Sequence, residues 1–204
     1  DGGYADRELQ EILLARGADA AQYLEQHAGV KWKTIKDFPD YYYPHAPGTV
    51  PHGRYLECEL FAGNELGDWQ SKTYNMSPHM PPGITHDELF EWGSLSCVMQ
   101  WDFAVMGKRM SKDVRGFGPG MMGYFVKAAV IDRNIQAWVN SPATGLITEE
   151  GRVVGVLAQK DGSTLRIRAR RGVLLGVGGY DWHPDFPKYY EGLPEWFSMC
   201  QPNV

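Results

Sequence analysis

The order of patterns between Phe125 and Gly179 constrains the fold of this chain more than any other feature. Apolar residues at helical spacing end near residues 132–134, and from there the period of the pattern changes to two. A short buried strand is predicted at 135–139, three strands of an antiparallel meander follow, and the apolar run 173–177 ends at a glycine pair. This order is typical of half of a nucleotide-binding α/β domain.

Two turn signals predict the meander. The run Glu149-Glu150-Gly151 separates a strand at 146–148 from one at 153–157. The pair Asp161-Gly162 is a strong signal for a tight hairpin, and it precedes an alternating strand at 165–168. Because the connections are this short, the three strands are expected to pair antiparallel.

The run 173–177 is apolar without alternation, as expected of a parallel strand that is covered on both faces. Gly176, Gly178 and Gly179 would then stand at its carboxyl end, where open α/β sheets bind their ligands. Glycine at such a place lets the backbone approach a phosphate or a sugar without a side chain in the way. A tight turn with no ligand explains the same glycines and stays an alternative.

The first half of the chain is less regular. Apolar spacing over residues 6–28 predicts two short helices that meet at Gly17. The segment 37–53 holds four prolines around a run of three tyrosines, and proline at that density excludes a helix.

Residues 63–114 are predicted to form an insertion of loops and helix. Its first part is polar and rich in glycine and proline. Thr85 and Glu88 then have the spacing of a capping box, so an aromatic helix is expected from His86 to about Met110.

Composition narrows the class of protein. The 204 residues, with 43% apolar and 22% charged residues, indicate a globular chain. A net charge of -5 argues against nucleic acid as a partner, and no apolar run is long enough to span a membrane. Three widely spaced cysteines make no disulfide framework, so a reducing cytoplasm is the expected location.

The other motifs in the sequence do not predict a functional site. Residues 118–123 match the G-x-G-x-x-G dinucleotide motif, but the preceding residues are polar and no acidic residue follows at the required distance. These glycines are therefore expected to permit close helix packing. The six histidines never show the helical spacing of a zinc site, and Gly93 to Cys97 does not match a hydrolase elbow. No metal is expected.

Several stretches together resemble the fumarate-reductase and 3-ketosteroid dehydrogenase family of FAD flavoproteins. The stretches that carry this resemblance are Arg115 to Gly118, Asn140 to Ala143, Gly151 to Val156 and Val173 to Tyr180. A further segment is similar to the 3-ketosteroid Δ1-dehydrogenase branch in particular: Asp40 to Pro44, Ala46 to Gly48 and Gly53 to Glu57.

The resemblance implies that residues 1–204 form part of an FAD-binding domain, Rossmann-like and of the glutathione-reductase type. The family's N-terminal fingerprint and its substrate (cap) domain are expected to be absent from this segment. The backbone of residues 176–179, that is Gly176, Val177, Gly178 and Gly179, would lie against the ADP part of FAD, and Ala143 near the adenine. The family's usual Ala-Thr-Gly-Gly is Gly-Val-Gly-Gly here, so a threonine hydroxyl is missing.

By the same resemblance, Tyr42 or Tyr43 would assist a catalytic tyrosine that lies outside this segment. The expected reaction is Δ1-dehydrogenation of a 3-ketosteroid-like ring ketone, with a hydride passing to the flavin and a tyrosine taking the proton. The expected partners are this small-molecule substrate and the remainder of a parent polypeptide, without which the chain would have little activity. A fumarate-reductase-like flavoprotein that reduces an enoate is one alternative, and a non-catalytic fragment or interaction module is another.

Overall fold

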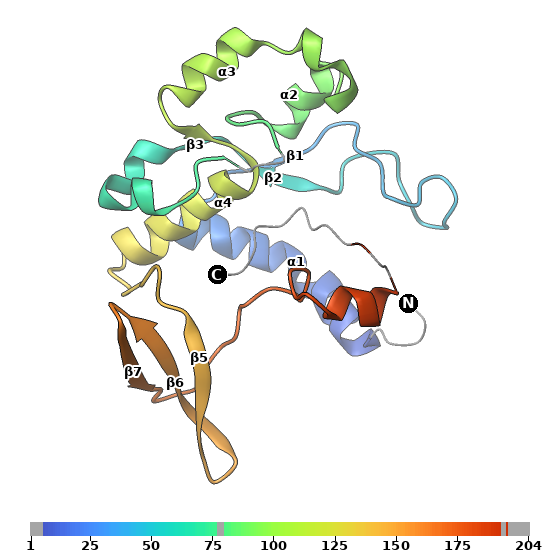
Figure 1. The fold of residues 1–204 in the computed structure, drawn as a ribbon. Helices are drawn as coiled ribbons and strands as arrows, with labels where there is room; N and C mark the ends of the chain where they lie inside the picture. Colours follow the sequence, from blue (N-terminus) through green and yellow to red (C-terminus); the bar gives the residue numbers. More distant parts are fainter. Residues whose placement is uncertain (1–5, 77–79, 193–194, 196–204) are drawn as a thin grey trace. The chain divides into compact units, whose positions relative to one another are not determined.

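The computed structural model describes residues 6–76, 80–192 and 195 (Figure 1). The chain divides into two compact units, Asp1–Gln136 and Ala137–Val204. Every paired strand among the described residues is antiparallel, in two two-stranded ladders and one three-stranded sheet. The predicted mixture of helices with an antiparallel meander is therefore confirmed, whereas the described residues show no parallel pairing.

The chain begins with one long helix, α1 (Arg7–Ala28). Asp6 caps its start by accepting hydrogen bonds from the Glu8 and Leu9 amides, and Gly29 ends it in the left-handed conformation. The prediction of two helices meeting at Gly17 is wrong. A glycine inside a helix costs only about 1 kcal/mol relative to alanine. A helix that is well capped at both ends can therefore continue through it.

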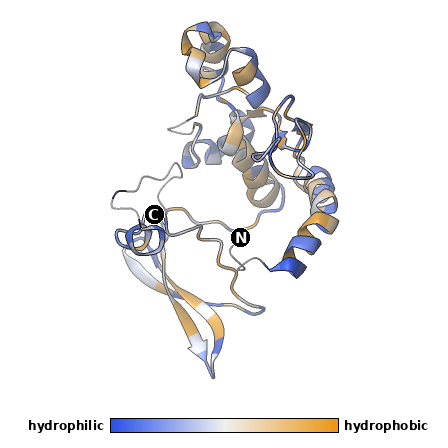
Figure 2. Cartoon of the chain, turned by 90° about the vertical axis from the view of Figure 1, so that its right-hand side faces the viewer, coloured by the Kyte–Doolittle hydropathy of each residue, from blue (hydrophilic) through white to orange (hydrophobic). Residues whose placement is uncertain are grey.

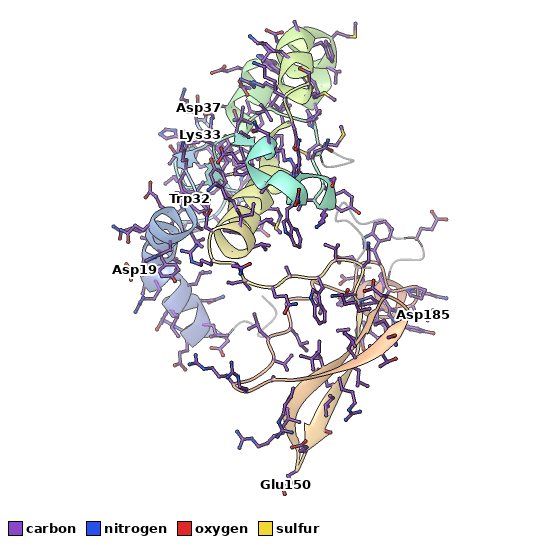
Figure 3. All side chains as sticks on the ribbon, turned by 90° about the vertical axis from the view of Figure 1, so that its left-hand side faces the viewer. Asp19, Trp32, Lys33, Asp37, Glu150 and Asp185 are labelled. Atoms are coloured by element: carbon purple, nitrogen blue, oxygen red, sulfur yellow. The ribbon has the colours of Figure 1, made fainter. Side chains whose placement is uncertain are left out.

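The core of the first unit forms where two small ladders meet helix α4 (Phe117–Val126). Strand β1 (Trp32–Thr34) pairs with β2 (Leu56–Cys58), and β3 (Phe61–Ala62) pairs with β4 (Val114–Arg115). The indole of Trp32, labelled in Figure 3, donates a 2.9 Å hydrogen bond to the Ala21 carbonyl and so ties α1 to this layer. The buried side chains of this core are Val30, Cys58, Phe61, Leu66, Tyr124 and Val126.

The glycines of the G-x-G-x-x-G match lie inside α4, where they serve packing. A Cβ atom added at Gly123 would lie 2.3 Å from the Phe61 ring, and one at Gly120 would lie 2.8 Å from the Arg115 carbonyl oxygen. The interpretation of this motif as a packing device is therefore confirmed at Gly120 and Gly123. The helix continues as the π-helix η3 (Lys127–Ile131), so the helical path ends near Asp132 as predicted.

The segment between β3 and β4 leaves and rejoins one ladder (Figure 1). It contains η1 (Gly63–Lys72), α2 (His86–Glu91), η2 (Leu95–Gln100) and α3 (Phe103–Met110). A second small core lies here, made of the buried side chains of Ile84, Leu89 and Met106.

The capping box at the start of α2 is confirmed, since Thr85 and Glu88 exchange both of the expected hydrogen bonds. The single helix predicted from His86 to Met110 is wrong. Gly93 has φ +86° and Ser94 has φ +64°, both outside the helical region, and Asp102 caps a new helix at Phe103. Turn-forming residues therefore divide the stretch into three short helices.

The second unit is built on the predicted meander: β5 (Ala143–Glu149), β6 (Arg152–Lys160) and β7 (Ser163–Arg168). Glu150, at the tip of the first turn in Figure 3, has φ +49° and Gly151 has φ +77°; Asp161 and Gly162 in the second turn have +50° and +76°. Positive φ at both central residues is the requirement of a type I′ hairpin. Hydrophobic residues recur along these strands, as the orange segments in Figure 2 show.

The strands predicted at 135–139 and 173–177 are wrong, because neither stretch forms a strand. A parallel strand exists only where a neighbouring strand satisfies its backbone groups, and neither stretch belongs to any of the described strand pairs. Leu174 is 95% exposed and Leu175 60% exposed, so neither of these side chains of the run 173–177 is covered.

Candidate functional site

The tyrosines singled out by the sequence lie in a loop between β1 and β2, called the tyrosine loop below (residues 37–54). Consecutive turns shape this loop, and the prediction that the segment forms no helix is confirmed. The Tyr42 carbonyl accepts hydrogen bonds from the His45 amide at 2.7 Å and from the Ala46 amide at 3.0 Å. The Thr49 hydroxyl donates to the Ala46 carbonyl at 2.7 Å. The backbone around Tyr42 is thus held by local hydrogen bonds.

The three tyrosines of the loop differ in their surroundings. The Tyr41 ring makes edge contacts with Phe38, at 6.4 Å between ring centres, and with Tyr55, at 6.0 Å. Tyr42 is 75% exposed and Tyr43 42% exposed, so both present their rings at the surface of the first unit. An exposed tyrosine beside an apolar cluster can offer its hydroxyl to a ligand that covers the loop.

The loop closes at its neck through Asp40. The Asp40 carboxylate accepts a 2.9 Å hydrogen bond from the Val50 amide and a 3.1 Å hydrogen bond from Arg54 Nε, and Arg54 Nη2 pairs with its other oxygen. The Asp40 amide donates to the Val50 carbonyl at 3.1 Å. One carboxylate therefore holds both ends of the tyrosine turns together.

A second polar cluster supports the foot of the loop, where Lys33 and Asp37 are labelled in Figure 3. Lys33 Nζ lies 2.9 Å from an Asp87 carboxylate oxygen, and the other oxygen of Asp87 accepts from the Lys36 amide at 2.9 Å. The buried Glu57 accepts from the His86 amide at 2.9 Å and contacts His86 Nδ1 at 2.8 Å. Its Oε1 atom lies 3.3 Å from Lys33 Nζ without hydrogen-bond geometry. Helix α2 is thereby attached to β1 and β2.

The carboxylates of this cluster have perturbed pKa values. Burial raises the pKa of Glu57, but the hydrogen bonds from His86 and the charge of Lys33 outweigh it, so the pKa lies below its ordinary value of 4.5. Burial also opposes ionisation of Asp87, yet hydrogen bonds from Lys33 and the Lys36 amide lower its pKa below 3.8. Both groups are therefore stabilised in their charged form by the fold.

These shifts predict acid sensitivity of the first unit. A carboxylate with a lowered pKa in the folded state stabilises the fold above its unfolded pKa, and this stabilisation is lost as the pH falls through the folded pKa. The free energy of unfolding is expected to stay level down to about pH 5 and to fall as the pH drops below about 4.5. Urea denaturation at a series of pH values measures this, and Glu57→Gln should flatten the acid limb. A rise in stability below pH 4.5 would contradict the assignment.

The predicted cofactor residues lie in the second unit. Ala143 is exposed at the first position of β5, opposite Ala158. Gly176, Val177, Gly178 and Gly179 follow one another in a stretch that is neither helix nor strand. A Cβ atom at Gly176 would meet no atom within 4 Å, and Gly178 has φ +75°, which favours glycine. Bare, open backbone of this kind fits the ADP part of FAD, and the individual contacts stay a prediction.

The residue after this stretch begins a small aromatic cluster. Tyr180 donates a 2.6 Å hydrogen bond to Glu191, and its ring lies near those of Phe186 and Tyr190. His183 Nδ1 accepts hydrogen bonds from the Asp185 and Phe186 amides at 3.2 Å. The segment 180–191, which follows the glycines, is therefore held by contacts among its own residues.

Sequence reasoning assigned no functional role to Asp40, Arg54, Glu57 or His86. The Asp40–Arg54 pair joins residues 14 positions apart and the Glu57–His86 pair residues 29 positions apart, and no local pattern records such a pairing. Within residues 6–76, 80–192 and 195, no group of three His, Cys, Asp or Glu side chains is placed to hold a metal ion. None of the described helices has the length and apolar character needed to cross a membrane. The cytoplasmic location stays a prediction.

Comparison with known proteins decides the family. The sequence profile described as the FAD binding domain matches residues 1–198. The chain belongs to the FAD binding domain family. The predictions of FAD as the cofactor and of a flavoprotein family are confirmed by this match.

Two proteins that are similar in sequence to this chain are named as dehydrogenases. The chain is 28% identical over 211 residues to 3-oxosteroid 1-dehydrogenase from Comamonas testosteroni, covering 93% of this chain and 35% of that protein. It is 29% identical over 187 residues to 4-oxocyclohexanecarboxylate 2-dehydrogenase from Sinomonas cyclohexanicum, covering 88% of this chain and 31% of that protein. The family member thus spans about a third of the length of these curated relatives.

A solved structure supports the fold. The 3-ketosteroid Δ1-dehydrogenase from Sterolibacterium denitrificans, in complex with 1,4-androstadiene-3,17-dione, superimposes with a TM-score of 0.69 at 27% identity. The match covers 87% of this chain and 35% of that one. The resemblance to the 3-ketosteroid dehydrogenase branch of the FAD flavoproteins is therefore confirmed.

Proposed function

We propose that this chain is part of a longer FAD-dependent dehydrogenase that introduces a carbon–carbon double bond beside a ring ketone. The observation that carries the proposal is shared by two relatives with different ring systems. In 3-oxosteroid 1-dehydrogenase and in 4-oxocyclohexanecarboxylate 2-dehydrogenase, the numbered carbon lies two positions from the oxo carbon. Loss of hydrogen there and at the carbon between gives an enone.

The chemistry follows from the ketone. A hydrogen on the carbon next to a carbonyl leaves as a proton, and the one on the following carbon leaves with its electron pair. Acceptance of that hydride is what FAD supplies when it is bound. In this chain, the hydroxyl of Tyr42 or Tyr43 supports the tyrosine that takes the proton, which we place outside residues 1–204. A 3-ketosteroid-like substrate is the proposed specific case.

The second unit is proposed to hold the cofactor. The backbone of residues 176–179 and of Ala143 binds the ADP part of FAD. The exposure of Leu174 and Leu175 supports a place for this unit in a longer protein, because apolar side chains of this size are normally covered in a finished domain.

The enoate-reducing alternative requires an arginine that delivers a proton. The buried Arg115 does not fit that role. All five N–H groups of Arg115 donate to protein acceptors. The tyrosine loop, in contrast, leaves the rings of all three tyrosines, 41 to 43, exposed. These observations favour dehydrogenation of a ketone over reduction of an enoate.

Flavin binding tests the proposal at the cofactor. The intact protein is expected to show flavin absorbance, and Gly176→Val is expected to weaken FAD binding by about tenfold or more, since roughly 1.4 kcal/mol of lost contact suffices. Gly172→Val is the matched control, because a Cβ at Gly172 likewise meets no atom within 4 Å. Titration of the apoprotein with FAD measures both. A folded protein that takes up no flavin would support the interaction-module alternative instead.

A further inference from the structure

The neck of the tyrosine loop joins two charged residues that flank the tyrosines in the sequence. Asp40 directly precedes the run of tyrosines, and Arg54 ends the loop. We propose that Asp40 and Arg54 are positioning residues, which hold Tyr42 and Tyr43 in place for the proton removal proposed above. This inference rests on the proposed function and adds the residues on which the tyrosine geometry depends.

The contacts at the neck are directional. Arg54 offers Nε to one oxygen of Asp40 and Nη2 to the other, which is the two-pronged pairing that a guanidinium makes with a carboxylate. Nη2 also donates to the Gly48 carbonyl at 3.3 Å. The Asp40 side chain is only 11% exposed, so water competes weakly for its oxygens. The pair thus connects the start, the middle and the end of the loop.

The tyrosines belong to turns and not to a helix or a strand. Residues 41–48 are held by turn hydrogen bonds whose ends meet at Asp40 and Val50. Ordering the backbone of a residue costs conformational entropy, so a loop of this kind keeps one conformation only where anchors offset that cost. The Asp40 carboxylate supplies two of the anchors, through the Val50 amide and through Arg54.

The foot of the loop is held separately. The Lys36 amide is bound by Asp87, and the Phe38 ring lies 5.6 Å from that of Phe90 in α2. Arg54 itself is 55% exposed and belongs to neither apolar core. Its replacement is therefore expected to loosen the tyrosine turns without unfolding the unit, since exposed ion pairs contribute little to global stability.

The test uses Arg54→Gln and Arg54→Lys in the intact, FAD-loaded protein. Hydrogen exchange of the His45, Ala46 and Val50 amides is expected to become at least about tenfold faster in Arg54→Gln, which corresponds to about 1.4 kcal/mol of lost local stability. Arg168→Gln removes an exposed two-pronged pair with Glu149 in the second unit and should leave these amides unchanged. Unchanged exchange in Arg54→Gln would overturn the inference.

Kinetics with a 3-ketosteroid and a dye acceptor give the second readout. We expect kcat to fall about tenfold or more in Arg54→Gln, KM to change less, and Arg54→Lys to recover part of the loss. If Tyr42→Phe or Tyr43→Phe lowers kcat but Arg54→Gln does not, the inference is wrong and the proposed function stands. If none of the three variants lowers kcat, the catalytic role of the loop is wrong, and the positioning role with it.

Discussion

Removal of one hydroxyl, by Tyr42→Phe or Tyr43→Phe in the intact protein, is expected to lower kcat for a 3-ketosteroid by about 10²- to 10⁴-fold, the range of general acid–base assistance. The reason is that a proton on carbon leaves slowly unless its acceptor is held and polarised by a neighbouring group. The phenylalanine ring keeps the size and packing of tyrosine, so the change acts on the hydrogen bond alone.

Tyr41→Phe is the matched control for this prediction. The Tyr41 ring packs against Phe38 and Tyr55, and phenylalanine preserves those edge contacts. Its kcat is expected to stay within about twofold of the unchanged protein, as for a substitution that removes no transition-state contact. Steady-state kinetics of the three variants decide the question. Equal losses in all three, or none in any, would exclude a specific role for positions 42 and 43.

The largest effect on stability is expected at Arg115. Its side chain is 1% exposed, and its guanidinium donates to the Thr73 hydroxyl, to the carbonyls of Tyr74 and Gln70, and to both carboxylate oxygens of Asp113. Arg115→Met leaves the Asp113 carboxylate with the Gln70 amide as its remaining side-chain donor, and it removes the guanidinium from the Tyr74 and Gln70 carbonyls. Breaking a buried ion pair from one side costs about 3–5 kcal/mol, so the first unit should unfold at markedly lower urea concentration.

Arg16→Met provides the comparison within the same unit. Arg16 pairs with Asp19 on the surface of α1 with 73% of its side chain exposed, so its loss should change the free energy of unfolding by less than about 1 kcal/mol. Equilibrium urea denaturation, followed by tryptophan fluorescence, measures both variants. Similar midpoints for the two would show that the Arg115 network contributes no more than a surface pair.

Local chemistry explains which parts of the fold were predictable. The type I′ turns at Glu150-Gly151 and Asp161-Gly162 need positive φ at adjacent positions, and those residue types adopt it most readily. The capping box at Thr85 and Glu88 spans four residues, so its hydrogen bonds form wherever the helix starts. In each case the residues that interact are neighbours in the chain.

Two predictions of secondary structure were wrong. The apolar run 173–177 was predicted as a buried parallel strand, and the described chain holds no strand to pair with it. Gly17 was predicted to divide a helix, but the caps at Asp6 and Gly29 outweigh its modest preference against helix. An apolar segment is predicted to be buried, but its composition does not identify the segment that buries it.

The amino-acid sequence by itself determined the antiparallel meander, the packing glycines of α4 and the membership of an FAD-binding family, because turns, close approach and cofactor segments depend on residue types at short spacing. Only the tertiary structure decided that Asp40 meets Arg54 at the neck of the tyrosine loop, that Glu57 meets His86 beneath it, and that Arg115 is fully bonded. Such pairs join residues that are separated along the chain, and the energy of each depends on burial and orientation, which exist only once the backbone has folded.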